Sequence, residues 1–311
     1  VDVENLSAES GLAASRFQGL LGVSGSDSGF SLAGTTPPAS EGNVVKLNAA
    51  LLDEPAALEG TLAHEFVHVI QTRTWAYRSV EEQLGPTPSR DAFLVYTSVL
   101  EGSAEYVERL YERQYVDANR SSVERWYLEE TTVAKQFVAR YYFGMRYVNA
   151  TVAGPAELDT VYEDPPRTTE ELIHRLEPGS EPPAPLSVSV EAQRNTTRRG
   201  PFGELYVRTL FGTALDEPAA ADLADGWGND TRVRFGSGNE SDYAWVLRWD
   251  DAANATEFER GVESYLDARD PQGTVRVERV APETTVLFVG DESFVNNATA
   301  SGGNATVTVA A

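Results

Sequence analysis

The residues with the clearest chemical potential lie in the segment LEGTLAHEFVHVIQTRT, residues 58–74. His64 and His68 are four apart, and Glu65 directly follows the first histidine. On a helix, side chains at positions i and i+4 lie above one another on one face, so both imidazoles can reach a single point. This is the HExxH arrangement, in which two neutral imidazoles bind Zn²⁺ and the glutamate takes a proton from metal-bound water. The alternative is a pair of solvent-facing histidines on an amphipathic helix.

A catalytic zinc requires a third protein ligand and an open fourth position. The chain has no cysteine and its third histidine lies far downstream, so we expect a carboxylate. In LEGSAEYVERL we assign this ligand to Glu101, and we expect Glu105 to accept a hydrogen bond from the outer nitrogen of an imidazole. The small residues 102–104 are expected to let this helix approach the histidine helix. Glu108 is interpreted as a solvated charge, and solvated glutamates are the alternative for Glu101 and Glu105.

Hydrolysis of an amide also needs a hydrogen-bond donor for the carbonyl oxygen, on which negative charge develops. His174, at the end of TTEELIHRL, is the candidate, with Arg167 as an alternative cation and Tyr106 as an alternative hydroxyl. For His174 the competing interpretation is a favourable contact with the helix dipole. For Tyr106 and Arg167 a purely structural role is favoured.

The motif and the downstream glutamate resemble the gluzincin layout of zinc peptidases. HEFVHVIQ followed by LEGSAEYVE is more narrowly similar to predicted HExxH surface proteins of haloarchaea and to related bacterial proteins. The likeness extends through residues 162–174 and 203–230, so it covers most of residues 43–260. It implies a zincin-like fold, one Zn²⁺ per chain and a peptide or protein substrate. Glu105 stands where the thermolysin-like ExxxD pattern has aspartate, which weakens its expected role.

Charge and composition indicate a setting for this chemistry. The formal net charge is −23 with a pI near 4.5, which argues against binding nucleic acid or an anionic membrane through bulk charge. Lys46 and Lys135 are the only lysines among 25 basic residues. An acidic chain with so little lysine resembles proteins of halophilic archaea, and an ordinary acidic protein is the alternative.

Asparagines that begin an Asn-x-Ser/Thr triplet are unusually dense, and they predict a glycoprotein that is secreted or on the cell surface. These glycosylation candidates are Asn5, Asn119, Asn149, Asn195, Asn229, Asn239, Asn254, Asn297 and Asn304. The absence of cysteine excludes disulfides, and no run of apolar residues is long enough to span a membrane. Because the sequence begins with Val and shows no signal peptide, a removed leader or membrane anchor stays open. The oligomeric state is also left open.

Hydrophobic periodicity predicts an α+β protein, with a zincin-like helical half that holds a small sheet and the active-site helix, followed by a ββαββ-like lobe. The expected domains are a metal-binding lobe at 1–176, a connecting segment at 177–200 and a C-terminal lobe at 201–311 packed against the first. One continuous domain is the alternative. The main expected helices are 55–74, capped by Asp53, then 89–117, 121–149, 168–176 and 200–215.

A strand at 43–48, NVVKLN, is placed to lead into the histidine helix. It can be an edge strand that pairs with an extended substrate, as in zincin folds, or an ordinary sheet strand. Taken together, these features predict an extracellular zinc-dependent hydrolase, specifically a peptidase with Glu65 as general base. The alternatives are a cell-envelope glycoprotein with a structural or inactive metal site, and a metal-free binding module. Two histidines and a carboxylate would also accept Mn²⁺ or Co²⁺.

Overall fold

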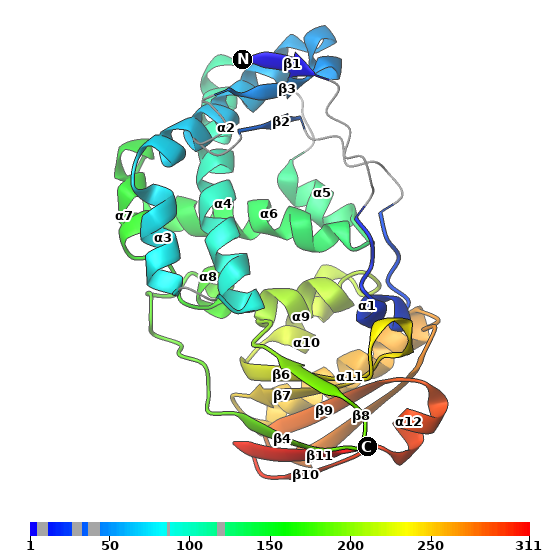
Figure 1. Ribbon diagram of the computed structural model, residues 1–311. Coiled ribbons are helices and arrows are strands. Elements are labelled where there is room, and N and C mark those ends of the chain that lie inside the picture. Colours follow the sequence, from blue (N-terminus) through cyan, green and yellow to red (C-terminus); the bar gives the residue numbers. More distant parts are fainter. Residues whose placement is uncertain (5–11, 27–32, 37–43, 86–87, 117–121) are drawn as a thin grey trace.

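The computed structural model describes residues 1–4, 12–26, 33–36, 44–85, 88–116 and 122–311. The protein is of the α+β class, as predicted. In Figure 1 a helical half with a small sheet lies above a half that contains two further sheets. The upper half holds the histidine motif.

The helices of the upper half surround one long central helix, α4. The α-helices are α2 (Pro55–Arg73), α3 (Ala76–Leu84), α4 (Arg90–Tyr115), α5 (Val123–Glu129), α6 (Ala134–Thr151), α7 (Leu158–Glu163) and α8 (Thr169–His174), with 3₁₀ helices η2 (Ala49–Asp53) and η3 (Pro155–Glu157). Two of the expected helices need correction. Asp53 ends η2 and does not cap α2, whose N-cap is Glu54 followed by Pro55 at the first helical position. The helix expected at 121–149 is two helices.

The break between α5 and α6 has a local cause. The Glu130 carboxylate accepts hydrogen bonds from the backbone N–H of Thr131 and from both the N–H and the hydroxyl of Thr132. These bonds hold the chain outside the helical conformation. Lys135 then donates to the carbonyl oxygens of Tyr127 and Glu130, which satisfies acceptors at the end of α5.

The small upper sheet has the strand order β1–β3–β2, formed by β1 (Asp2–Glu4), β3 (Lys46–Asn48) and β2 (Gly34–Thr35). β3 is parallel to β1 and antiparallel to β2, so both of its edges are paired. The edge-strand interpretation of residues 43–48 is therefore wrong for the described part, residues 44–48. Among the strands that the structure describes, the unpaired edge nearest the histidine helix belongs to β2.

Helices α4 and α6 cross at two glycines. A Cβ atom on Gly102 would lie 2.2 Å from the carbonyl carbon of Gly144, and one on Gly144 would lie 2.0 Å from the carbonyl oxygen of Ser98. Only glycine permits this approach. The small residue at 102 was expected to serve the contact with the histidine helix, but it brings α6 close to α4 instead.

The lower half is built on a five-stranded antiparallel sheet with the order β5–β6–β7–β9–β8 and a three-stranded sheet with the order β10–β11–β4. Its elements are β4 (Ser187–Glu191), β5 (Thr196–Arg199), α9 (Glu204–Phe211), α10 (Glu217–Ala224), β6 (Trp227–Phe235), η4 (Gly238–Glu240), β7 (Asp242–Trp249), α11 (Ala252–Ala268), β8 (Thr274–Ala281), β9 (Thr284–Gly290), α12 (Glu292–Asn297), β10 (Thr299–Gly302) and β11 (Thr306–Ala310). The order β6–β7–α11–β8–β9 is the expected ββαββ unit.

Helix α1 (Arg16–Leu20) belongs to the first part of the chain but lies low in Figure 1, beside the lower half. The Phe17 ring meets Trp245 edge to face, with 5.6 Å between the ring centroids, and the Tyr265 hydroxyl donates to the carbonyl oxygen of Leu21. One large hydrophobic core accordingly includes residues from both halves. The division into lobes at 177–200 stays a prediction.

Buried hydrogen bonds join the halves. Asp91 on α4 accepts from the backbone N–H and the hydroxyl of Thr169 on α8, at 3.0 and 2.6 Å. The same hydroxyl oxygen accepts from the backbone N–H of Leu205 on α9. In the lower half, Asp230 accepts from two buried tryptophan side chains and two backbone N–H groups. The carboxyl groups of Asp91 and Asp230 therefore both have hydrogen-bond partners, as buried polar groups usually do.

Candidate metal centre

The expected metal ligands meet between helices α2 and α4. His64 and His68 lie one turn apart on α2, and their Nε2 atoms are 3.1 Å apart. From α4, the Oε2 atom of Glu101 lies 3.5 Å from Nε2 of His64 and 3.3 Å from Nε2 of His68. The structure thus brings together the three residues that the sequence assigns as ligands.

The spacing of these three atoms suits a tetrahedral metal. Ligand atoms bound to Zn²⁺ at about 2.0–2.1 Å lie about 3.4 Å from one another in a regular tetrahedron. The separations of 3.1, 3.3 and 3.5 Å lie around that value. A triangle of this size leaves the fourth corner of the tetrahedron without a protein ligand among these residues.

Partners on the far side of each ring fix the imidazoles. Nδ1 of His64 lies 3.1 Å from a carboxylate oxygen of Glu108, and Nδ1 of His68 lies 2.7 Å from Oε1 of Gln71. Gln71 is itself oriented because its Nε2 donates to the carbonyl oxygen of Leu100 and to the Tyr162 hydroxyl, both at 3.0 Å. An ionised carboxylate and an amide oxygen only accept, so both Nδ1 atoms are donors.

This assignment leaves three acceptors facing one another. A neutral imidazole with a proton on Nδ1 has a lone pair on Nε2. Two such lone pairs and the oxygen of Glu101 converge on one point, and they repel one another unless a cation lies between them. A proton is one such cation: burial lowers the pKa of His64, but hydrogen bonds to Glu101 and Glu108 raise it well above its ordinary value overall. A divalent metal is another, and it satisfies all three atoms at once.

The carboxylate that accepts a hydrogen bond from a histidine is that of Glu108, not that of Glu105. Glu105 is paired with Arg109 one turn along α4, with Nε of Arg109 2.7 Å from its Oε1 atom. Glu105 is therefore hydrogen-bonded to Arg109, and Nδ1 of His64 is hydrogen-bonded to Glu108, which is buried. The expected role of Glu105 and the solvated interpretation of Glu108 are both corrected. The signal was present in the sequence, since Glu108 follows Glu101 by seven residues and therefore lies on the same helix face.

Glu65, the expected general base, is 5% exposed and lies beneath strand β2. The Thr36 hydroxyl donates to its Oε2 atom at 2.7 Å. Gly34 allows this approach, because a Cβ atom there would lie 2.8 Å from Cγ of Glu65. Burial raises the pKa of Glu65, while the charges of His68 and His64 and the Thr36 hydrogen bond lower it. A raised carboxyl pKa is suited to proton transfer near neutral pH.

Two tyrosines that sequence reasoning missed lie beside the ligands. The Tyr141 ring, on α6, stacks on His64 with 5.9 Å between the ring centroids, and burial and the charge of Glu101 raise the pKa of its hydroxyl. Burial and the charge of Glu101 raise the pKa of Tyr77, on α3, and the charge of Glu65 also contributes. Both hydroxyls therefore stay protonated. No spacing rule links residues 77 and 141 to the motif, because helix packing alone brings them there.

The expected transition-state donors lie elsewhere. His174 is exposed, and its Nε2 atom contacts both carboxylate oxygens of Glu204 at 3.1 Å and Asp225 at 3.6 Å, in the lower half. Arg167 binds Asp164 and the carbonyl oxygen of Pro165. Tyr106 packs in the hydrophobic core. Within the described residues, none of the three side chains forms a hydrogen bond or an ion pair with the ligands, so the structure gives no support to these three assignments.

The glycosylation candidates differ in their surroundings. Asn5 and Asn119 lie outside the described residues. Four side chains are exposed, at Asn149, Asn195, Asn239 and Asn297. The other three are half-buried, at Asn229, Asn254 and Asn304. The amide nitrogens of these three and of Asn297 donate hydrogen bonds within the fold. An amide already bonded within the fold is a poorer acceptor for a sugar than a free one.

Comparison with known proteins adds one likeness. A family model described as a domain of unknown function (DUF8575) matches residues 191–311. This segment lies in the lower half and contains none of the candidate metal ligands. No curated protein and no solved structure matched the chain. Within the described residues, no helix has both the length and the apolar character needed to cross a bilayer.

Proposed function

We propose that this protein is a zinc-dependent hydrolase of the gluzincin type, acting as a peptidase. The observation that carries the proposal is the convergence of Nε2 of His64, Nε2 of His68 and Oε2 of Glu101 within 3.1–3.5 Å, with each Nδ1 held as a donor. Three acceptors arranged in this way fit a divalent cation. Glu65 beside them fits a hydrolytic role, because a structural site has no use for a base.

Each residue would then have a definite task. His64, His68 and Glu101 would hold the ion, and Glu108 and Gln71 would keep the imidazoles in the required tautomer. Zn²⁺ would supply a Lewis acid that polarises a carbonyl group and lowers the pKa of water. Glu65 would accept a proton and pass it to the leaving amine.

The hydrogen-bond donors for the developing oxyanion would be Tyr77 and Tyr141 in place of His174. The stacking of Tyr141 on His64 and the effect of the Glu101 and Glu65 charges on both hydroxyls support this role. We further propose an extracellular or cell-surface location in a halophile. The four exposed triplet asparagines and the net charge of −23 support this setting.

A second candidate is a metal site without turnover, as in a cell-envelope glycoprotein. The burial of the site favours this candidate, because His64 and His68 are each 8% exposed. In addition, the Thr36 hydroxyl donates a hydrogen bond to Oε2 of Glu65. Catalysis would then depend on the other carboxylate oxygen, Oε1, to accept a proton of the reacting water. The two candidates share the metal and differ in the use of Glu65.

Elemental mass spectrometry of the purified protein tests the metal. We expect close to one zinc per chain in the wild type, loss of it in His64→Ala, and retention in His174→Ala, the matched control at the histidine outside the site. Absence of metal from the wild type after incubation with zinc would reject both candidates.

A peptide-cleavage screen then tests the use of Glu65. Glu65→Gln should keep zinc and lose hydrolysis by a factor of at least about 100, as removal of a general base does. Cleavage by this variant at the wild-type rate would refute the mechanism. A zinc-loaded wild type that cleaves nothing in the screen would favour the structural site.

A further inference from the structure

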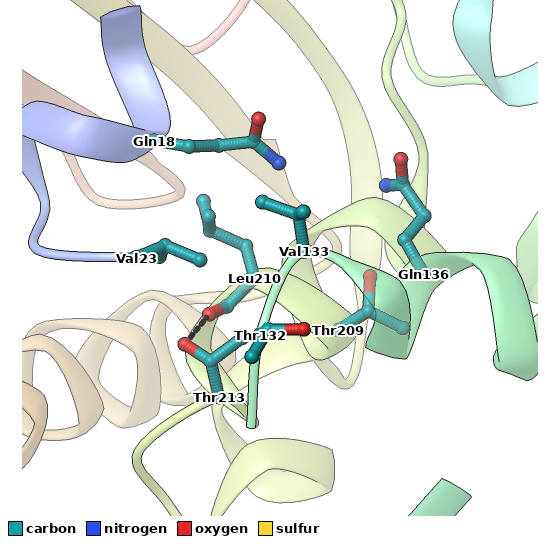
Figure 2. A pocket seen from close by; sticks show the side chains of 8 residues that line it. All are labelled: Gln18, Val23, Thr132, Val133, Gln136, Thr209, Leu210 and Thr213. Atoms are coloured by element: carbon teal, nitrogen blue, oxygen red, sulfur yellow. Dashed lines mark hydrogen bonds between the residues drawn. The ribbon is translucent and has the colours of Figure 1, made fainter. Parts of the chain in front are cut away.

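A cavity of about 290 Å³ lies between α1, the first turn of α4 and the first half of α6, and its lining is unusual for so acidic a chain. We call it the arginine pocket and define it by Gln18, Arg90, Phe93, Gln136, Phe137 and Arg140. Its volume is near the lower end of the range for small-molecule sites. Figure 2 shows a smaller adjoining cavity of about 10 Å³, room for one water molecule, that shares Gln18, Val133 and Gln136 with the pocket.

The two arginines of the pocket have no carboxylate partner among the described residues. Arg90 donates to the amide oxygen of Gln136, and Nε of Arg140 donates to the carbonyl oxygen of Phe137 at 3.3 Å. Each guanidinium has five N–H donors, so most of them have no acceptor within the part of the chain that the structure describes. With 48 acidic and 25 basic residues in the chain, two neighbouring arginines without an acidic partner are unexpected.

The pocket holds these guanidiniums in place by other means. The guanidinium of Arg140 lies over the Phe137 ring, 4.3 Å from its centroid, and that of Arg90 lies 5.2 Å from the centroid of Phe93. Stacking on an aromatic face orients the planar fork and leaves its edge free for an anion. Burial lowers the pKa of Arg90, and the charges of Arg140 and Arg232 lower it further, while Tyr206 opposes the shift.

A chain of ring contacts links the pocket to the metal centre. Phe137 and Tyr141 lie one turn apart on α6 with centroids 5.4 Å apart, and Tyr141 stacks on His64. With separations of 5.9, 5.4 and 4.3 Å, the guanidinium of Arg140 lies at most about 16 Å from the His64 ring. An extended peptide covers that distance in about five residues.

We propose that the arginine pocket binds a carboxylate of the substrate, from an acidic side chain or from the C-terminus, within about five residues of the bond presented to the metal centre. Guanidinium forks bind carboxylates through paired N–H donors, and the phenylalanine rings would contact the apolar part of the same residue. The inference about the substrate rests on the proposed function. The capacity of the pocket to bind carboxylates does not depend on the proposed function.

Calorimetry with benzoate tests the pocket itself, with benzamide as the uncharged probe of the same shape. We expect benzoate to bind the wild type, benzamide to bind at least ten-fold more weakly, and both Arg90→Gln and Arg140→Gln to weaken benzoate at least ten-fold. Arg78→Gln is the matched control, because Arg78 is 80% exposed and lies on α3. Thermal unfolding verifies that the variants fold. No benzoate binding by the wild type, or equal binding by wild type and both pocket variants, would overturn the proposal.

Paired peptides separate the two sources of the carboxylate. A preference for free-acid over amidated termini that is lost in Arg140→Gln would assign the C-terminus, and a preference for Asp over Asn that is lost would assign the side chain. An active wild type with neither preference would refute the substrate role. If no peptide is cleaved, the proposed function fails, while benzoate still decides whether the pocket binds carboxylates.

Discussion

At the scale of single residues, the outer partners of the two imidazoles set the chemistry of the centre. Glu108 and Gln71 each accept a hydrogen bond from an Nδ1–H group. The lone pair of each imidazole is therefore on Nε2, which faces Glu101. Without such a partner a histidine can adopt the other tautomer, in which Nε2 carries the proton and cannot bind metal. The identity of the partner therefore matters as much as the identity of the ligand.

Glu108→Gln should lower zinc affinity by about 10- to 100-fold, because an amide supports the Nδ1 donor less strongly than a carboxylate. Glu105→Gln is the matched change one turn earlier on the same helix, and it should have a smaller effect since Arg109 already engages that carboxylate. Competition against a chromogenic chelator measures both affinities. Equal losses in the two variants would contradict the assignment of Glu108.

At the scale of elements, the crossing of α4 and α6 places Tyr141 against His64. The crossing depends on Gly102 and Gly144, whose backbones touch. The sequence predicted the bounds of α2 and α4 to within two residues, although Asp53 does not cap α2. Pro55 marks the first position of α2, and Ser89 caps α4. The sequence did not predict the angle at which α6 crosses α4, nor the break at residues 130–133, since both depend on contacts between residues that are distant in sequence or on a local side-chain bond.

Gly102→Ala should destabilise the fold by about 1–3 kcal/mol, as overpacking of a close contact does. The added methyl group would lie 2.2 Å from the carbonyl carbon of Gly144, and backbone cannot move away as a side chain can. Gly154→Ala is the control, because a Cβ atom there would meet nothing within 4 Å. Urea unfolding compares the two, and a loss of stability at Gly154 as large as that at Gly102 would refute the packing explanation.

At the scale of the whole molecule, the α+β class and the grouping of His64, His68 and Glu101 could be predicted, because each depends on spacing along one or two helices. The position of His174 could not be predicted from the sequence. Its position beside Glu204 and Asp225 depends on how the upper half packs on the lower half, and no local pattern encodes that. The same packing buries Asp91, which the sequence leaves as an ordinary acid on a helix.

Asp91 makes the stability of the whole molecule depend on pH. Burial raises its pKa to about 7, although hydrogen bonds from Thr169 oppose the shift. Between the ordinary carboxyl pKa near 4 and this raised value, the folded protein keeps a proton that the unfolded chain has lost. The folded state therefore binds more protons over this range, and the free energy of unfolding falls as the pH rises from about 4 to about 7.

Asp91→Asn removes this titration and keeps an oxygen that can accept from Thr169. Since one pKa unit corresponds to about 1.4 kcal/mol, wild type should lose up to about 4 kcal/mol relative to the variant across that range. The repulsion among the other acidic residues acts on both proteins and cancels in the difference. Urea unfolding at pH 4, 5, 6, 7 and 8 measures it. If the free energies of unfolding of wild type and Asp91→Asn changed in parallel with pH, the pKa of Asp91 would not be raised in the folded protein.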